Sequence, residues 1–372
     1  MITRAGLFLG LALATAGAAQ ADPVTVTDVA GREITLEAPA QRIILGEGRQ
    51  IYLLAALERE NPFQHVVGWR EDLSQADPDT YAAYAAQFPE LEDLPTFGGF
   101  KDGTFDVEQA ATLQPDLILM NLEAKAATED AGYDDKLAQL GIPIVYVDFR
   151  EDPLAHSVQS MRIMGALTGH EDRAEEYISF VDRQMARVAT ALEGGNFDRP
   201  RVFVDRAGGY SDDCCMTFGR GNFGEYVELA GGTNIAADIV PGTFGTLNPE
   251  QIIAANPDQI IVTGGQWDAY VPGGNWVGVG PGSDLTEARR KLEALTHRTA
   301  MTGVAAIGTG QVHAIWHQFY DNPYYFVAVQ QLAKWLHPDR FADLDPEATL
   351  KELHERFLPI PYQPGYWVSL HD

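Results

Sequence analysis

Short apolar runs alternate with amphipathic stretches along most of the chain. The runs form two series, at residues 42–45, 66–69, 117–120 and 144–147, and then at 201–204, 260–262 and 312–316. Apolar runs of this length, separated by helical segments, are typical of buried strands in parallel sheets. The pattern therefore predicts an α/β fold with two sets of strands.

The stretch between the two series has a helical pattern of unusual length. Apolar residues recur there at steps of three and four, first at Leu154, Val158, Met161, Met164 and Leu167, then at Tyr177, Ile178, Val181, Met185, Val188 and Leu192. Such spacing favours amphipathic helix, and Gly194, Gly195 and Pro200 end it. We expect residues 153–195 to form a long helical connection between two lobes.

The two halves also share a repeat. The segment "FDVEQAATLQPDLILM", which begins at Phe105, aligns without a gap with "LNPEQIIAANPDQIIV", which begins at Leu247. Asp106 and Asn248 can each cap a helix, and the Pro of each Pro-Asp pair ends that helix before an apolar strand. Two copies of one unit favour a duplicated lobe.

These observations predict an α/β protein with two Rossmann-like lobes, each with a central, mostly parallel sheet, joined by a long connecting helix. We expect the N-terminal lobe at 22–152, the connecting helix at 153–195, the C-terminal lobe at 196–338, and a C-terminal helix and tail at 339–372 that packs on the body.

The first residues have the pattern of a secretory signal peptide. Arg4 precedes an apolar stretch that is too short to span a bilayer, and Ala19-Gln20-Ala21 forms a small-residue cleavage site. We expect residues 1–21 to be removed and the mature chain to be periplasmic, without stable membrane insertion.

Composition narrows the possible functions. Apolar residues make up 45% of the chain and charged residues 21%, as in globular proteins, and the formal net charge is −27. So acidic a chain repels nucleic acid, which we exclude as a partner. The chain has no G-x-S-x-G, P-loop, H-E-x-x-H or C-x-x-C motif, so we expect neither an enzyme nor a cofactor or directly bound metal.

Several segments together resemble one known family. They are "VTDVAGREITLEAPAQRIILG", the repeated Glu-x₆-Pro-Asp unit, "ELAGGTNIA" (228–236) and "GQVHAIWHQFYDNPYYFVAVQQLAKWLHP" (310–338). In this order they are similar to the class III periplasmic binding proteins of the iron-siderophore and cobalamin type.

That resemblance implies two rigid lobes that enclose a cleft and a monomer that delivers a metal chelate to the membrane subunits of an ABC importer. The best expectation for the chelate is a ferric siderophore. Haem or cobalamin is the alternative within the class. A periplasmic redox enzyme or a sensor that uses Cys214 and Cys215 is the alternative outside it.

Candidate ligand residues follow from the rule that open α/β sheets bind ligands beyond the carboxyl ends of their strands. Arginine suits anionic oxygens, and aromatic side chains offer flat apolar area with a polar tip. We expect the chelate to bind without a protein atom on its metal, although His317 could instead contact an iron or haem centre. The candidates are Arg49, Trp69, Arg70, Lys101, Arg206, Tyr210, Trp267, His317, Phe319 and Tyr320.

Glu108 and Glu250 occupy equivalent positions in the repeat, each in the first turn of a predicted helix. The helix macrodipole alone would favour a carboxylate there. The resemblance implies more, namely that one Glu on each lobe pairs with arginines of the importer's membrane subunits.

Cys214 and Cys215 are the only cysteines. An oxidising compartment favours their pairing. Adjacent Cα atoms, however, lie only about 3.8 Å apart across a trans peptide, below the usual disulfide range. We expect a vicinal disulfide, with two free thiols, or a redox or soft-metal role, as the alternatives.

Overall fold

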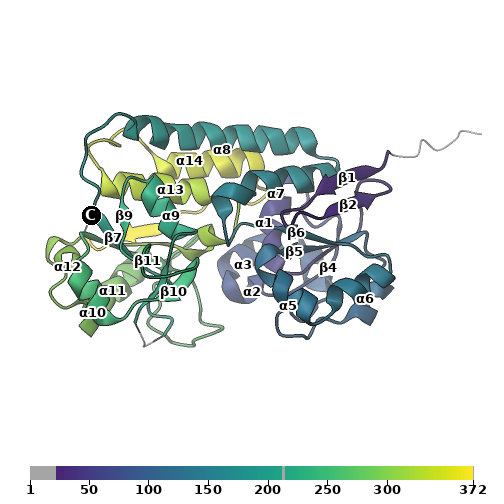
Figure 1. Cartoon of the computed structure of the whole chain (residues 1–372), viewed down its shortest axis with the longest axis horizontal. Helices are drawn as coiled ribbons and strands as arrows, with labels where there is room; N and C mark the ends of the chain where they lie inside the picture. The colour runs from purple at the N-terminus through teal and green to yellow at the C-terminus, as the bar shows by residue number, and fades with distance from the viewer. Residues whose placement is uncertain (1–21, 212–213, 372) are drawn as a thin grey trace, which may run out of the picture.

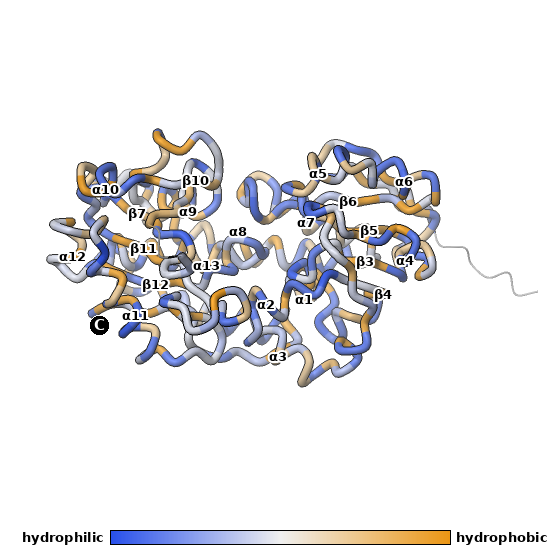
Figure 2. Tube along the Cα trace, turned by 90° about the horizontal axis from the view of Figure 1, so that it is seen from below, coloured by the Kyte–Doolittle hydropathy of each residue, from blue (hydrophilic) through white to orange (hydrophobic). Residues whose placement is uncertain are grey.

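The computed structural model describes residues 22–211 and 214–371. The expected signal peptide, residues 1–21, lies outside the described residues. Two sheets lie side by side along the long axis of the molecule, each surrounded by helices (Figures 1 and 2). The predicted α/β fold with two mostly parallel sheets is confirmed.

The first sheet has four parallel strands in the order β4-β3-β5-β6. Their side chains are mostly buried because helices cover the sheet, which explains the continuous apolar runs. The strands are β3 (Ile43–Leu45), β4 (Val66–Trp69), β5 (Leu117–Asn121) and β6 (Ile144–Val147). A short antiparallel pair, β1 (Val24–Thr27) and β2 (Glu33–Leu36), precedes them.

The second sheet has five strands in the order β13-β12-β11-β7-β9, and only β13 is antiparallel. The strands are β7 (Arg201–Asp205), β9 (Thr233–Asn234), β11 (Gln259–Gly264), β12 (Val312–Trp316) and β13 (Trp367–Ser369). β8 (Met216–Phe218) and β10 (Phe244–Thr246) form a separate antiparallel pair. Since β13 comes from the C-terminal tail, that tail extends the sheet.

Helices belong to three groups. In the first lobe they are α1 (Ile51–Leu57), α2 (Leu73–Ala76), α3 (Pro78–Gln87), α4 (Val107–Thr112), α5 (Lys125–Asp130) and α6 (Tyr133–Gln139). The middle helices are α7 (Pro153–Thr168) and α8 (Glu171–Leu192). The second lobe and the tail have α9 (Phe223–Leu229), α10 (Pro249–Ala255), α11 (Leu285–Thr296), α12 (Ala305–Thr309), α13 (Tyr325–Leu336) and α14 (Pro346–Phe357).

The connection between the lobes is two helices rather than one continuous helix. Gly169 has a left-handed φ of +73° and ends α7, and α8 starts two residues later. α7 packs on β1 and β6 of the first lobe, whereas α8 contacts both α1 and α13. The long connecting helix is therefore α8, which runs over both lobes in Figure 1. The domain limits given above stay a prediction.

The sequence repeat is also a structural repeat. Asp106 and Asn248 each accept a hydrogen bond from the backbone N–H three residues on, at 2.9 Å, and so cap α4 and α10. Asp116 then accepts the backbone N–H of the residue just before β3, and Asp258 accepts that of the first residue of β7, both at 2.9 Å. The two lobes thus share one helix-turn-strand unit. Among the described residues, no helix combines the length and the apolar character needed to cross a membrane.

Candidate ligand-binding cleft

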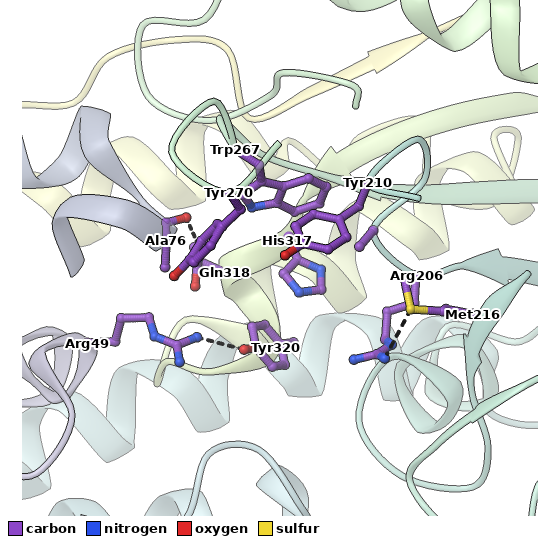
Figure 3. A pocket seen from close by; sticks show the side chains of 11 residues that line it. Arg49, Ala76, Arg206, Tyr210, Met216, Trp267, Tyr270, His317, Gln318 and Tyr320 are labelled. Atoms are coloured by element: carbon purple, nitrogen blue, oxygen red, sulfur yellow. Dashed lines mark hydrogen bonds between the residues drawn. The ribbon is translucent and has the colours of Figure 1, made fainter. Parts of the chain in front are cut away.

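A cavity of about 240 Å³ lies between the two lobes (Figure 3). Its first-lobe residues follow β3 and end α2, and its second-lobe residues lie beyond β7, β11 and β12 or open β8. The cavity therefore lies beyond the carboxyl ends of the strands, where open α/β sheets bind ligands. The lining residues are Arg49, Ala76, Arg206, Ala207, Tyr210, Met216, Trp267, Tyr270, His317, Gln318 and Tyr320.

Glycines place two of these side chains by allowing close backbone approach. A Cβ at Gly48 would lie 2.3 Å from the carbonyl oxygen of Arg70, so glycine lets the turn that carries Arg49 pack against the end of β4. A Cβ at Gly264 would lie 2.2 Å from the carbonyl oxygen of Val277. The loop that carries Trp267 therefore also depends on glycine.

Aromatic rings form one wall of the cavity. The ring centroids of Tyr210 and Trp267 are 5.6 Å apart at 82°, and those of Tyr210 and Tyr270 are 6.2 Å apart. His317 lies edge-on to Trp267 at 5.4 Å and against Tyr320 at 4.3 Å. These rings offer flat apolar surface with hydroxyl groups at its edge.

Arg206 is a partly buried cation without an acidic partner. Its guanidinium donates to the Met216 sulfur at 3.5 Å and lies 5.1 Å from the centre of the Phe244 ring. Nε has no hydrogen-bond partner, and no carboxylate in residues 22–211 or 214–371 forms an ion pair with this side chain. Burial lowers the pKa of the guanidinium. An anionic ligand in the cavity would compensate the charge of this guanidinium.

Arg49, by contrast, is already paired. It contacts Asp72 at 2.8 Å and Asp321 at 2.9 Å, and it donates to the Tyr320 hydroxyl at 2.6 Å. Because that hydroxyl oxygen accepts from Arg49, its own proton remains available to donate into the cavity.

Arg150, which follows β6, connects the two lobes through ion pairs. It is 6% exposed and contacts Glu47 at 2.7 Å, as well as Glu123 of the first lobe and Asp321 of the second. Burial raises the pKa of Glu47, but Arg150 and Arg49 outweigh this effect and hold it at about 2. Arg150 was not among the predicted ligand residues, although it lies three residues after the end of β6, where the strand-end rule applies.

Neutral hydrogen bonds also join the lobes beside this network. Gln318 donates to the Ala76 carbonyl at 2.7 Å, and Asn222 donates to the Arg150 carbonyl at 2.8 Å. These contacts place the two sides of the cavity in a defined arrangement.

Two of the expected ligand residues, Trp69 and Phe319, do not line the cavity, because their side chains are buried in the core. Trp69 is 1% exposed and packs against Phe63 and Tyr81. Phe319 is fully buried and packs edge-on against Trp316. The strand-end rule selects a segment and does not give the direction of each side chain.

Arg70 and Lys101 do not line the cavity either. Arg70 lies 3.9 Å from Asp102, and Lys101 pairs with Glu123 at 2.5 Å. Both side chains are partly exposed on the first lobe. The six remaining candidates, Arg49, Arg206, Tyr210, Trp267, His317 and Tyr320, come together around one cavity.

Five further residues that line the cavity were not predicted, namely Ala76, Ala207, Met216, Tyr270 and Gln318. Ala76 and Met216 have no distinguishing chemistry, and Gln318 is one of many polar residues. Tyr270 lies in the loop after β11, where it is 42% exposed. A tyrosine three residues after Trp267 was the only usable sequence signal among the five.

Glu108 and Glu250 are both exposed, in the first turns of α4 and α10. Among the described residues neither forms an ion pair. Figure 2 labels their helices at opposite ends of the long axis, one on each lobe. Both carboxylates are therefore available to a partner.

Cys214 and Cys215 form a disulfide in the structure. Met216, the next residue, lines the cavity, and the Cys215 carbonyl accepts from the Leu247 N–H at 3.1 Å. The pair therefore lies immediately before a cavity residue.

We expect protein isolated from the periplasm to contain this disulfide, because that compartment favours oxidation. Denatured protein treated with iodoacetamide should gain no adduct, and prior reduction should yield two. Intact-protein mass spectrometry measures both. Two adducts without reduction would contradict the assignment.

The side chains that could ligate a metal are scattered over the described residues. Across residues 22–211 and 214–371, no three His, Cys, Asp or Glu side chains gather so that they could hold a metal ion.

Comparison with solved structures supports the fold. The TroA-like periplasmic binding protein FepB from Veillonella parvula is 27% identical, with a TM-score of 0.84 over 94% of this chain and all of that one. The molybdate-bound MolA structure from Haemophilus influenzae is 18% identical, with a TM-score of 0.69 over 91% of this chain and 99% of the other.

Sequence relatives point the same way. A cobalamin-binding protein of Halobacterium salinarum is 26% identical over 65% of this chain, and the match spans 58% of that protein's length. The family described as periplasmic binding protein matches residues 63–315. The chain therefore belongs to the periplasmic binding protein family.

Proposed function

We propose that this chain captures a ferric siderophore in the periplasm and delivers it to an ABC importer. The observation that carries the proposal is Arg206, which has no acidic partner among residues 22–211 and 214–371 and lies in a cavity walled by aromatic rings. Ferric chelates of catecholates, hydroxamates or carboxylates combine anionic oxygens with flat groups. Arginine and aromatic side chains suit both features.

The size of the cavity supports a compact chelate. Its volume of about 240 Å³ is below the ~300–1,000 Å³ of sites that bury most of a drug-sized ligand. Haem and cobalamin are large macrocycles, and they would require more opening between lobes that are joined by ion pairs. The name of the Halobacterium salinarum relative nevertheless makes cobalamin the second ligand to test.

Binding can be followed by quenching of tryptophan fluorescence, because Trp267 lines the cavity. We expect quenching by at least one of three probes, namely ferric citrate, a ferric catecholate and a ferric hydroxamate. Cobalamin and haem, tested in parallel, should bind more weakly. Tight binding of either macrocycle, with no response to the ferric probes, would overturn the ligand assignment.

Replacing Arg206 by Met should weaken binding of the responsive ferric probe roughly 10- to 100-fold. The reason is the loss of a charge-assisted hydrogen bond of about 1.5–3 kcal/mol. Arg220→Met is the matched control, because Arg220 lies on the same lobe in an exposed pair with Asp238. An unchanged dissociation constant for Arg206→Met would remove the main support for an anionic ligand.

A further inference from the structure

His317 is held by a hydrogen bond from behind the cavity. The side chain lines the cavity and is 8% exposed, and its Nδ1 lies 2.8 Å from Oγ1 of Thr263 in β11. Only Nδ1 has a hydrogen-bond partner among the described residues. The other ring nitrogen, Nε2, is left for whatever occupies the cavity.

The hydroxyl of Thr263 decides which nitrogen carries the proton. Thr263 is fully buried, and its Oγ1 already accepts the backbone N–H of Ala207 at 2.9 Å. Apart from His317, no described group is placed to accept the hydroxyl proton. If Nδ1 were protonated, Oγ1 would accept twice and its own proton would be buried without a partner, which is costly.

We infer that Thr263 donates its hydroxyl proton to Nδ1 and thereby holds His317 in the tautomer with the proton on Nε2. His317 then presents a neutral N–H donor to the cavity. Given the proposed function, the chelate atom that lies against His317 is an oxygen acceptor and not the metal. Thr263 acts as a positioning residue for ligand recognition.

Metal ligation by His317 requires the opposite arrangement. A histidine that binds a metal through Nε2 needs a free lone pair on that atom, and it usually donates its Nδ1–H to a second group. Thr263 supplies a donor at that place, so it opposes this arrangement. Burial, with Arg206, Arg49 and Arg150 nearby, lowers the pKa of His317 well below its usual value, which keeps the ring neutral.

Two neighbouring side chains, Arg206 and Tyr320, also offer hydrogen-bond donors to the cavity. The Nη1 group of Arg206 has no hydrogen-bond partner among the described residues, and the Tyr320 hydroxyl retains a proton because its oxygen accepts from Arg49. With Nε2–H of His317, three donors face one cavity. This arrangement selects a ligand surface rich in oxygen acceptors.

Nitrogen-15 NMR of ligand-free protein labelled at histidine tests the tautomer directly. The chain has nine histidines, and His317→Gln identifies the His317 signals by their loss. We expect a protonated Nε2 and an unprotonated Nδ1 in the wild type and in Thr263→Ser, which keeps the hydroxyl. In Thr263→Val the tautomer with the proton on Nδ1 should appear, because the hydroxyl that donates to Nδ1 is absent.

A protonated Nδ1 in the wild type would overturn the inference, and so would identical spectra for Thr263→Val and the wild type.

Equimolar zinc chloride provides a second test. The Nε2–H signal should persist, whereas its loss would show that Nε2 is available to a metal. None of these measurements involves a chelate. A wrong ligand assignment would therefore leave them unchanged, and a wrong tautomer would leave chelate binding intact.

Discussion

Replacing Arg150 by Met is expected to lower the free energy of unfolding by about 3–5 kcal/mol, because two buried carboxylates then share Arg49 as their only remaining arginine partner. Arg150 contacts Glu47, Glu123 and Asp321, and Glu47 and Asp321 are almost fully buried. Methionine fills much of the same volume, so the loss of charge dominates over the loss of packing. Since Asp321 belongs to the second lobe, the change also weakens a contact between lobes.

The effect should depend on pH. The pKa of Glu47 is held at about 2 in the folded protein, below the ordinary value of 4.5. This carboxylate therefore stabilises the fold above about pH 4.5, and the contribution is lost as the pH falls toward 2. Without Arg150, most of the contribution of the Glu47 carboxylate to the free energy of unfolding is lost. The difference between wild type and variant should be largest above pH 4.5 and should shrink in acid.

Urea denaturation monitored by circular dichroism measures this difference in the free energy of unfolding. The variant should unfold at a lower urea midpoint, with the same dependence of the free energy on urea concentration. Arg162→Met is the matched control, because Arg162 forms an exposed pair with Glu175 in which both side chains are more than half accessible. That variant should change stability by less than about 1 kcal/mol. Equal midpoints for the two variants would show that the Arg150 network contributes little.

The strands and their order in the chain could be predicted because buried parallel strands have a continuous apolar pattern. All seven predicted strands are present, including β4 with its expected limits at Val66 and Trp69. The antiparallel pairs were missed, because β1 and β2 are short and only half-buried. β13 was missed too, since its pairing with β12 joins residues far apart in the chain.

The cavity could be predicted only to the level of segments. The strand-end rule found six lining side chains, but it also selected Trp69 and Phe319, whose direction depends on packing that sequence does not reveal. The ion-pair partners of Arg150 could not be predicted from the sequence either. Glu47, Glu123 and Asp321 come from three distant segments, so only the fold shows that they converge on one guanidinium.

Changing Glu108 and Glu250 together to Gln is expected to reduce importer-dependent uptake to background while chelate affinity stays unchanged. Each carboxylate lies exposed on its own lobe, outside the cavity. The proposed importer would supply arginines to both. A close interfacial charge pair is worth roughly 1.5 kcal/mol or more, so the loss of two pairs should weaken docking at least about a hundredfold.

Importer-dependent uptake is measured with a radioactive ferric chelate and vesicles that contain the importer. Chelate affinity is measured by fluorescence quenching. Glu171→Gln is the matched control, since Glu171 is also exposed in the first turn of a helix, α8, on the side of the molecule opposite α10 (Figure 1). Each single variant should retain partial uptake, because the two lobes carry equivalent contacts. Full uptake by the double variant would exclude the two carboxylates from docking, and weakened chelate binding would instead assign them to the ligand site.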